Sequence, residues 1–400
     1  MLKINRGQLH ASVSKVYESL LPLSFNLTGL VAGVFVATFS GVIATVPWGF
    51  LIYPGILSIR GALGGLFAGR LSTALHLGTV KPQLRDNTVH LSILVKSIVA
   101  LTLLSGVFIG LTGSVFSGLY TGFSAVESLK IIAVTIATMA VSNVVISPIT
   151  FGLSIVSFNR GYDPDVVLYP IVSTVADIMI TITYIAMVWL SLSQTGLIMI
   201  TAVATGFTAW SALVIRENMA EDEFSQTIRE FLITLVIVSV IVGITGTTLE
   251  RISERIQGAR EIYAIYPALI DTIGDVGSII GCTLTTKLAL GTVPSHPRRL
   301  SDLKGELGEV VSAWGASVIL FGMYALIASL IYAPAGLAAL TLRLLALNLI
   351  SVPIIILVVF VITYATYSRG WNPDNFLIPI ESSLADTVTT LALLLVLLLG

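Results

Sequence analysis

Long apolar segments are the feature that most constrains this chain. A membrane-spanning helix needs about 20 mostly apolar residues, and eleven such segments follow one another, near 24–46, 53–77, 91–117, 129–157, 166–190, 196–215, 228–248, 266–290, 311–333, 337–367 and 376–399. None of the polar connections is long enough to form a soluble domain. The sequence therefore predicts an all-α polytopic membrane protein with about eleven transmembrane helices.

The composition agrees with a body embedded in lipid. Of 400 residues, 55% are hydrophobic and 11% are charged, and the mean hydropathy is +0.96. A soluble domain carries about a quarter charged residues, because its surface faces water. The formal net charge of −1 offers no broad basic face, so we expect membrane lipid and no nucleic acid as a partner. With one cysteine, Cys282, the chain cannot form an intrachain disulfide or a Cys-based zinc site.

An internal repeat organises the eleven segments. Residues 53–80 (YPGILSIRGALGGLFAGRLSTALHLGTV) align without a gap on residues 266–293 (YPALIDTIGDVGSIIGCTLTTKLALGTV), at an offset of 213, with 11 of 28 positions identical. Residues 159–177 (NRGYDPDVVLYPIVSTVAD) align on residues 368–386 (SRGWNPDNFLIPIESSLAD), at an offset of 209. Two motifs in the same order at nearly the same offset indicate a duplication.

The number of spans fixes the symmetry that we expect. Five spans, one extra span and five more make the second copy enter the membrane from the same side as the first. The halves are then parallel repeats related by an axis along the membrane normal, with a transport path at their interface. We expect a first domain over 1–193, a linker helix and loop over 194–226 and a second domain over 227–400, which together make a pseudo-dimer within one chain.

The basic residues predict the orientation. With a cytoplasmic N-terminus, four basic residues fall in outside connections: Lys130, Arg251, Arg255 and Arg260. Twelve fall inside, namely Lys3, Arg6, Lys15, Lys81, Arg85, Arg160, Arg216, Arg229, Arg298, Arg299, Lys304 and Arg369. The positive-inside rule then favours a multi-pass plasma-membrane protein with its N-terminus in the cytoplasm and its C-terminus outside. The segment Thr247–Glu261 we interpret as a short amphipathic helix outside.

One aspartate lies at an equivalent place inside the fifth span of each half, Asp177 in the first and Asp386 in the second. A carboxylate at that depth costs at least a few kcal/mol unless it is hydrated, paired or metal-bound. Hydroxyl residues precede each aspartate by three or four positions and share its helix face: Ser173, Thr174, Ser382 and Ser383. Mg²⁺ keeps much of its water shell and is held by one or two carboxylates, so these oxygens predict a divalent-cation site. A structural aspartate that caps a broken helix or pairs with an arginine is the alternative.

A glycine motif repeats in the second span of each half, and it adds one further acidic candidate. The glycines at 61, 64, 65 and 69 and at 274, 277 and 281 serve either tight helix packing or an unwound, pore-lining segment. Asp275 lies within the second motif, where the first has Ala62, so a ligand there would make the metal site asymmetric. Arg60 and Arg70 occur only in the first copy, and each could neutralise a buried carboxylate or extend toward an interface, of which we expect the latter.

At these motifs the sequence resembles the MgtE superfamily of magnesium transporters, specifically the solute-carrier branch with two MgtE-type membrane domains in one chain. The resemblance rests on residues 54–78, their copy at 267–291, and NPDNFLIPIESSLAD at 372–386. It implies five-helix domains, a pore between them, and fifth-helix aspartates that bind hydrated Mg²⁺, here Asp177 and Asp386. The family usually has GN in the second-span motif, whereas this chain has Gly61-Ala62 and Gly274-Asp275.

The functional hypothesis is transport of a divalent cation, Mg²⁺ first, with no organic cofactor. A carrier that couples the cation to Na⁺ or H⁺ through the same carboxylates is the alternative. An intramembrane enzyme has thin support, because no nucleophile and base repeat and no phosphate-binding loop occurs; a purely structural membrane protein would tolerate apolar residues at both aspartates. The oligomeric state stays open, including a homo-oligomer.

Overall fold

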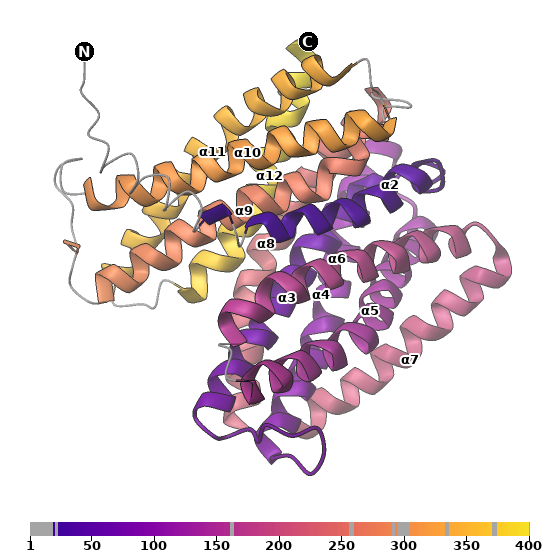
Figure 1. Ribbon diagram of the computed structural model, residues 1–400. Helices are drawn as coiled ribbons and strands as arrows, with labels where there is room; N and C mark the ends of the chain where they lie inside the picture. Colours follow the sequence, from indigo (N-terminus) through magenta and orange to yellow (C-terminus); the bar gives the residue numbers. More distant parts are fainter. Residues whose placement is uncertain are drawn as a thin grey trace. The chain divides into compact units, whose positions relative to one another are not determined.

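The computed structural model describes residues 19–20, 23–160, 164–255, 260–289, 293–294, 304–332, 336–369 and 374–399 (Figure 1). Within them every regular element is a helix. The elements are η1 (Ser24–Thr28), α2 (Gly29–Ile43), α3 (Gly49–His76), α4 (Val89–Thr121), α5 (Ala125–Asn159), α6 (Pro164–Ser191), α7 (Gln194–Asn218), α8 (Asp222–Arg255), α9 (Arg260–Ala289), α10 (Lys304–Tyr332), α11 (Leu337–Tyr367) and α12 (Asp374–Leu399).

The predicted spans are confirmed, with corrections at α8. Eleven helices of the described chain are long and apolar enough to cross a membrane. However, α8 begins at Asp222, inside the stretch that we interpreted as a polar connection. It also continues to Arg255, so the prediction of a separate amphipathic helix from Thr247 is wrong over 247–255. Residues 256–259 of that segment lie outside the described residues, and 260 and 261 begin α9. Apolar and small residues over 231–249 carry the helical pattern into the charged segment without a proline to end it.

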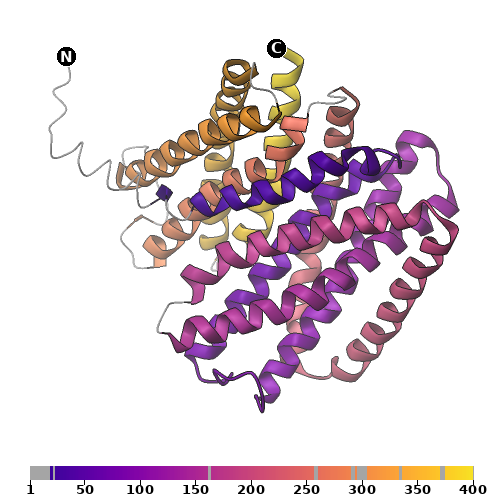
Figure 2. The ribbon, with the colours of Figure 1, turned by 45° about the vertical axis from the view of Figure 1, so that its right-hand side comes forward.

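The chain divides into two compact units, and each is described by itself. One unit, Val34–Gly258, holds most of α2 and all of α3 to α8. Within it α3 contacts α4, α5, α6 and α8, so α3 is its central helix. The extra helix α7 packs on α4, α5 and α6 and lies along the edge of the unit (Figures 1 and 2).

The other unit consists of Met1–Gly33 and Ala259–Gly400. Its central helix is α9, which contacts α10, α11, α12 and η1. The two central helices α3 and α9 are the ones that carry the repeated glycine motif, with Pro54 and Pro267 inside them.

The first helix of each copy packs on the other copy's central helix. The segment η1–α2 opens the first copy in sequence, yet η1 contacts α9 and α10. Likewise α8 opens the second copy but contacts α3 and α4. A glycine marks each crossing: a Cβ on Gly33 would lie 1.8 Å from the carbonyl oxygen of Ala264, and one on Gly246 would lie 1.5 Å from that of Leu51. Both pairs keep the offset of 213, so the two crossings are equivalent.

Equivalent contacts recur inside the two units. Tyr53 and Thr181 share a hydrogen bond of 2.9 Å between their hydroxyls. Tyr266 and Thr390 share one of the same length. Apolar clusters also correspond, with Leu71, Leu75 and Val80 in one unit and Leu284, Leu288 and Val293 in the other. The duplication read from the sequence is therefore present in the packing.

Candidate functional site

Asp177 lies on α6, facing the interior of its unit. Its side chain is buried, with 7% exposed. Thr174, one turn earlier, is half-buried, and the side chain of Ser173 is outside the described part of the chain. One turn later, Thr181 forms the hydrogen bond with Tyr53 of α3. The α3–α6 contact thus fixes the height of Asp177 in the bundle.

Asp386 occupies the equivalent place on α12. It is 6% exposed, Ser383 is fully buried and Ser382 is half-buried. One turn later, the hydroxyl of Thr390 shares a hydrogen bond with the hydroxyl of Tyr266 on α9. The Thr390 hydroxyl donates a hydrogen bond of 2.6 Å to the backbone oxygen of Asp386. Each aspartate therefore sits one turn before the threonine that ties its helix to the central helix. The two belong to different units, so their meeting on a common axis stays a prediction.

Asp275 lies on α9 and is hydrogen-bonded by a residue of η1. Asn26 of η1 donates a hydrogen bond of 2.8 Å from Nδ2 to Oδ2 of Asp275. The same amide nitrogen lies 3.5 Å from the hydroxyl of Thr272, which in turn bonds Tyr324 of α10 at 2.7 Å. Three elements of one unit thus converge on this carboxylate. At the matching position α3 has Ala62 and no acid.

Glu381 on α12 is a buried acid that the sequence reasoning missed. It is 0% exposed, and its Oε2 accepts a hydrogen bond of 3.1 Å from Ser278 of α9. Gly277 makes room for it, because a Cβ there would lie 2.1 Å from Oε1 of Glu381. The aligned motifs do contain evidence for this acid: Glu381 stands where the first copy has Val172, five residues before the aspartate that both copies have.

Glycines of the α9 motif serve packing against α12, whereas nothing lies within 4 Å of a Cβ on Gly61 of α3. Both α3 and α9 run as continuous helices through their glycine motifs, so the alternative of an unwound segment is not what the described chain adopts. In α9, a Cβ on Gly281 would lie 2.3 Å from the side chain of Leu377, and Gly274 faces the Cβ of Ala385 at 3.8 Å. These glycines let α12 approach α9 and bring its acidic side chains against the central helix.

Arg60 corrects an expectation. We expected it to extend to an interface, but its side chain is 2% exposed and Nη1 donates a hydrogen bond of 3.2 Å to Oδ1 of Asn143 on α5. Arg60 lies near the middle of the helix, too far from either end for its head group to reach water. Arg70, nearer the end, donates to the hydroxyl of Thr227 of α8.

These side chains can hold a cation that keeps its water. In the described parts of the chain, no three His, Cys, Asp or Glu residues are grouped so as to bind a metal ion directly. The carboxylate and hydroxyls on α6 in one unit, and those on α9 and α12 in the other, each suit contacts through water instead, which is how Mg²⁺ is commonly held. Soft sulfur ligands are missing from these positions, so the residues do not favour copper or zinc.

Comparisons with known proteins complete this picture. Searches of curated proteins and of solved structures gave no match. A family model described as MgtE, divalent cation transporter, matches residues 53–187 and 266–396. The two matched regions begin at the tyrosines that open the aligned motif, Tyr53 within α3 and Tyr266 within α9, and each includes its buried aspartate. Because they cover more than half of the chain, this protein belongs to the MgtE family of divalent cation transporters.

Proposed function

We propose that this protein moves Mg²⁺ across the membrane along a path between its two repeats, with Asp177 and Asp386 attracting the hydrated ion. The observation that carries the proposal is the equivalent burial of both aspartates, each fixed one turn before a Tyr–Thr hydrogen bond. A fold that places an acid twice at the same buried point, at a cost of a few kcal/mol each, favours a cation as the reason. The hydroxyls of Thr174, Ser382 and Ser383 would bind water of the ion's shell, together with Ser173.

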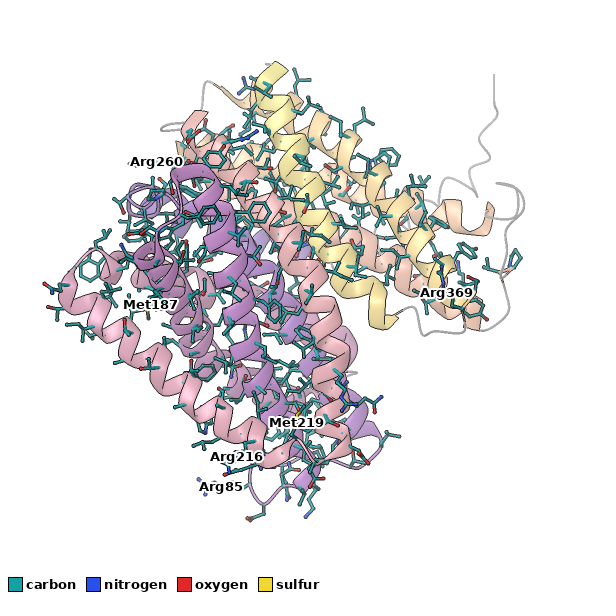
Figure 3. All side chains as sticks on the ribbon, turned by 180° about the vertical axis from the view of Figure 1, so that it is seen from behind. Arg85, Met187, Arg216, Met219, Arg260 and Arg369 are labelled. Carbon is teal, nitrogen blue, oxygen red and sulfur yellow. The ribbon has the colours of Figure 1, made fainter. Side chains whose placement is uncertain are left out.

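The proposed arrangement is a pseudo-dimer of parallel repeats over 1–193 and 227–400, with 194–226 as linker. We further propose a plasma-membrane location with the N-terminus in the cytoplasm and the C-terminus outside. Figure 3 supports that orientation within each unit: Arg85 and Arg216 lie at the same end of the Val34–Gly258 unit, and Arg260 and Arg369 lie at opposite ends of the other. These are the sides to which the positive-inside rule assigns them.

Flux into liposomes tests the role of the aspartates. The protein is reconstituted with a Mg²⁺-sensitive dye inside the vesicles, and Asp177→Ala with Asp386→Ala is expected to lower the initial rate at least tenfold. Glu217→Gln is a matched control, because Glu217 is an exposed acid on the linker helix α7. Wild-type rates from the double alanine variant would refute the proposed site.

Imposed gradients separate the two transport mechanisms. A passive pathway follows the Mg²⁺ gradient alone. Uptake that requires an opposing Na⁺ or H⁺ gradient would instead assign exchange through the same carboxylates.

A further inference from the structure

The buried carboxylate of Glu381 is not satisfied by the protein around it. An ionised carboxylate accepts about four hydrogen bonds. Among the described residues, Ser278 is its one hydrogen-bond donor, and Oε1 has no partner. No described lysine, arginine or histidine forms an ion pair with it. A buried acid left in this state costs several kcal/mol.

Two further acids lie near Glu381. A charge on Asp275 or on Asp386 would oppose the ionisation of Glu381. Its Oε1 points at Gly277 of α9. In the sequence, Gly277 lies between Asp275 and Ser278. Asp275 has a neutral amide partner, Asn26, which fixes its Oδ2 but does not neutralise it. We call Asp275, Ser278 and Glu381 the α9–α12 polar cluster.

The other repeat shows that the fold does not need this cluster. The central helix and the fifth helix contact each other in both units. In the first repeat, however, Asp275 is replaced by Ala62, Ser278 by Gly65 and Glu381 by Val172. The partner of Asp275 differs as well, because Ser239 of α8 stands at the position of Asn26. The same helix pair is therefore built without acids at these positions, and the acids of the second repeat have another role.

We propose that the α9–α12 polar cluster is a cation subsite within the second repeat, which takes a divalent cation that keeps part of its water shell. Glu381 and Asp275 supply the charge, Ser278 holds Oε2 of Glu381, and Asn26 positions the carboxylate of Asp275. Water around the ion fills the lone pairs that the protein leaves open. The proposal extends the proposed function, since it places a second cation on the way to or from Asp386.

Binding of Mn²⁺ to the purified full-length protein tests the subsite. The free ion is measured by electron paramagnetic resonance during titration, with no membrane gradient. Two variants restore the residues of the first repeat, Glu381→Val and Asp275→Ala. Each is expected to remove one bound Mn²⁺ or to weaken it at least tenfold, and the double variant is expected to lose no second ion, because both residues serve one ion.

Thermal unfolding distinguishes loss of the subsite from a purely structural effect of Glu381→Val. In EDTA, Glu381→Val is expected to unfold at the same temperature as the parent or higher, because an unsatisfied buried charge is removed. In Mn²⁺ the parent gains more stability than the variant, since binding stabilises the folded state. The subsite is refuted if Glu381→Val binds Mn²⁺ within twofold of the parent, if the double variant loses two Mn²⁺ ions, or if Glu381→Val is less stable in EDTA.

The subsite and the proposed function fail separately. Unchanged Mn²⁺ binding by Glu381→Val, with flux still lost in the Asp177→Ala and Asp386→Ala double variant, removes the subsite and leaves the transport site. If Glu381→Val loses Mn²⁺ binding while the double alanine variant keeps normal flux, the subsite stands and the proposed transport site is removed.

Discussion

A tyrosine hydroxyl on the central helix marks the same point in each repeat. Tyr53 and Tyr266 are both fully buried, and each reaches a threonine that lies one turn beyond an aspartate. A hydrogen bond of this kind contributes about 1 kcal/mol to stability. It also prevents the fifth helix from sliding along the central one, which would move the carboxylate.

Removing the two hydroxyls tests the equivalence. Tyr53→Phe and Tyr266→Phe keep the ring and are each expected to lower the free energy of unfolding by about 1 kcal/mol. Because the sites share no partner, the double variant should lose the sum. Thermal unfolding in detergent measures this, and a loss confined to one variant would contradict the repeat equivalence.

Arg60 is a cation held inside the first repeat by a neutral acceptor. We expect Asn143→Ala to destabilise the protein by about 2 kcal/mol, because the guanidinium loses a buried hydrogen bond. Adding Arg60→Met should recover much of that loss, since an apolar side chain needs no acceptor. Val144→Ala, a neighbour that is 66% exposed, is the control. Equal thermal stability of Asn143→Ala and the control would show that the bond contributes nothing.

Part of the candidate site could be predicted from the sequence. Asp177 and Asp386 stand out because an acid in an apolar span is rare and here occurs twice. Glu381 was missed because it has no counterpart in the first repeat, and a search for shared residues passes over it. The partner of Asp275 could not be predicted either, since Asn26 lies 249 positions away and only the packing of η1 on α9 brings them together.

At the scale of helices, the two close crossings decide how the bundle is assembled. At Gly33 and Gly246, a helix backbone lies against the carbonyl oxygen of a central helix, with no room for a side chain. Glycine inside a helix lowers the helix stability by about 1 kcal/mol relative to alanine, and at these two positions it allows the two backbones to approach closely.

Alanine at either crossing should be destabilising. Gly33→Ala and Gly246→Ala force the helices apart, and we expect each to cost about 3 kcal/mol or more, as overpacking does. Gly206→Ala on α7 is the control, because nothing lies within 4 Å of the added methyl, and it should not lower the unfolding temperature. Unfolding temperatures in detergent measure the difference. Tolerance of alanine at both crossings would mean that the helices do not approach this closely.

The helices were predictable where apolar runs are long, and their partners were not. All eleven spans follow from length and hydropathy. The start of α8 at Asp222 was missed because charged residues were read as a connection, although they suit the first turn of a helix. The packing of η1 on α9 and of α8 on α3 leaves no sign in hydropathy, because it depends on which surfaces fit.

At the scale of the whole molecule, the proposed orientation makes a prediction about access. In a Cys282→Ser background, a cysteine at Phe123, in the exposed turn between α4 and α5, should react with an impermeant maleimide added to intact cells. A cysteine at exposed Gln83, at the other end of α4, should react only after permeabilisation. The reverse pattern would invert the orientation, and labelling of both in intact cells would contradict the spanning of α4.

The crossed first helices also set an order of events during synthesis. The first repeat leaves the ribosome with its central helix still lacking α8, which arrives only after the linker helix α7. The segment η1 lacks its partners for longer, because α9 and α10 are made only after α8. A chain interrupted between Asn218 and Asp222 would therefore deprive the finished repeat of its covering helix and leave the N-terminal segment without a binding surface. Neither half therefore holds all the helices that cover its own central helix.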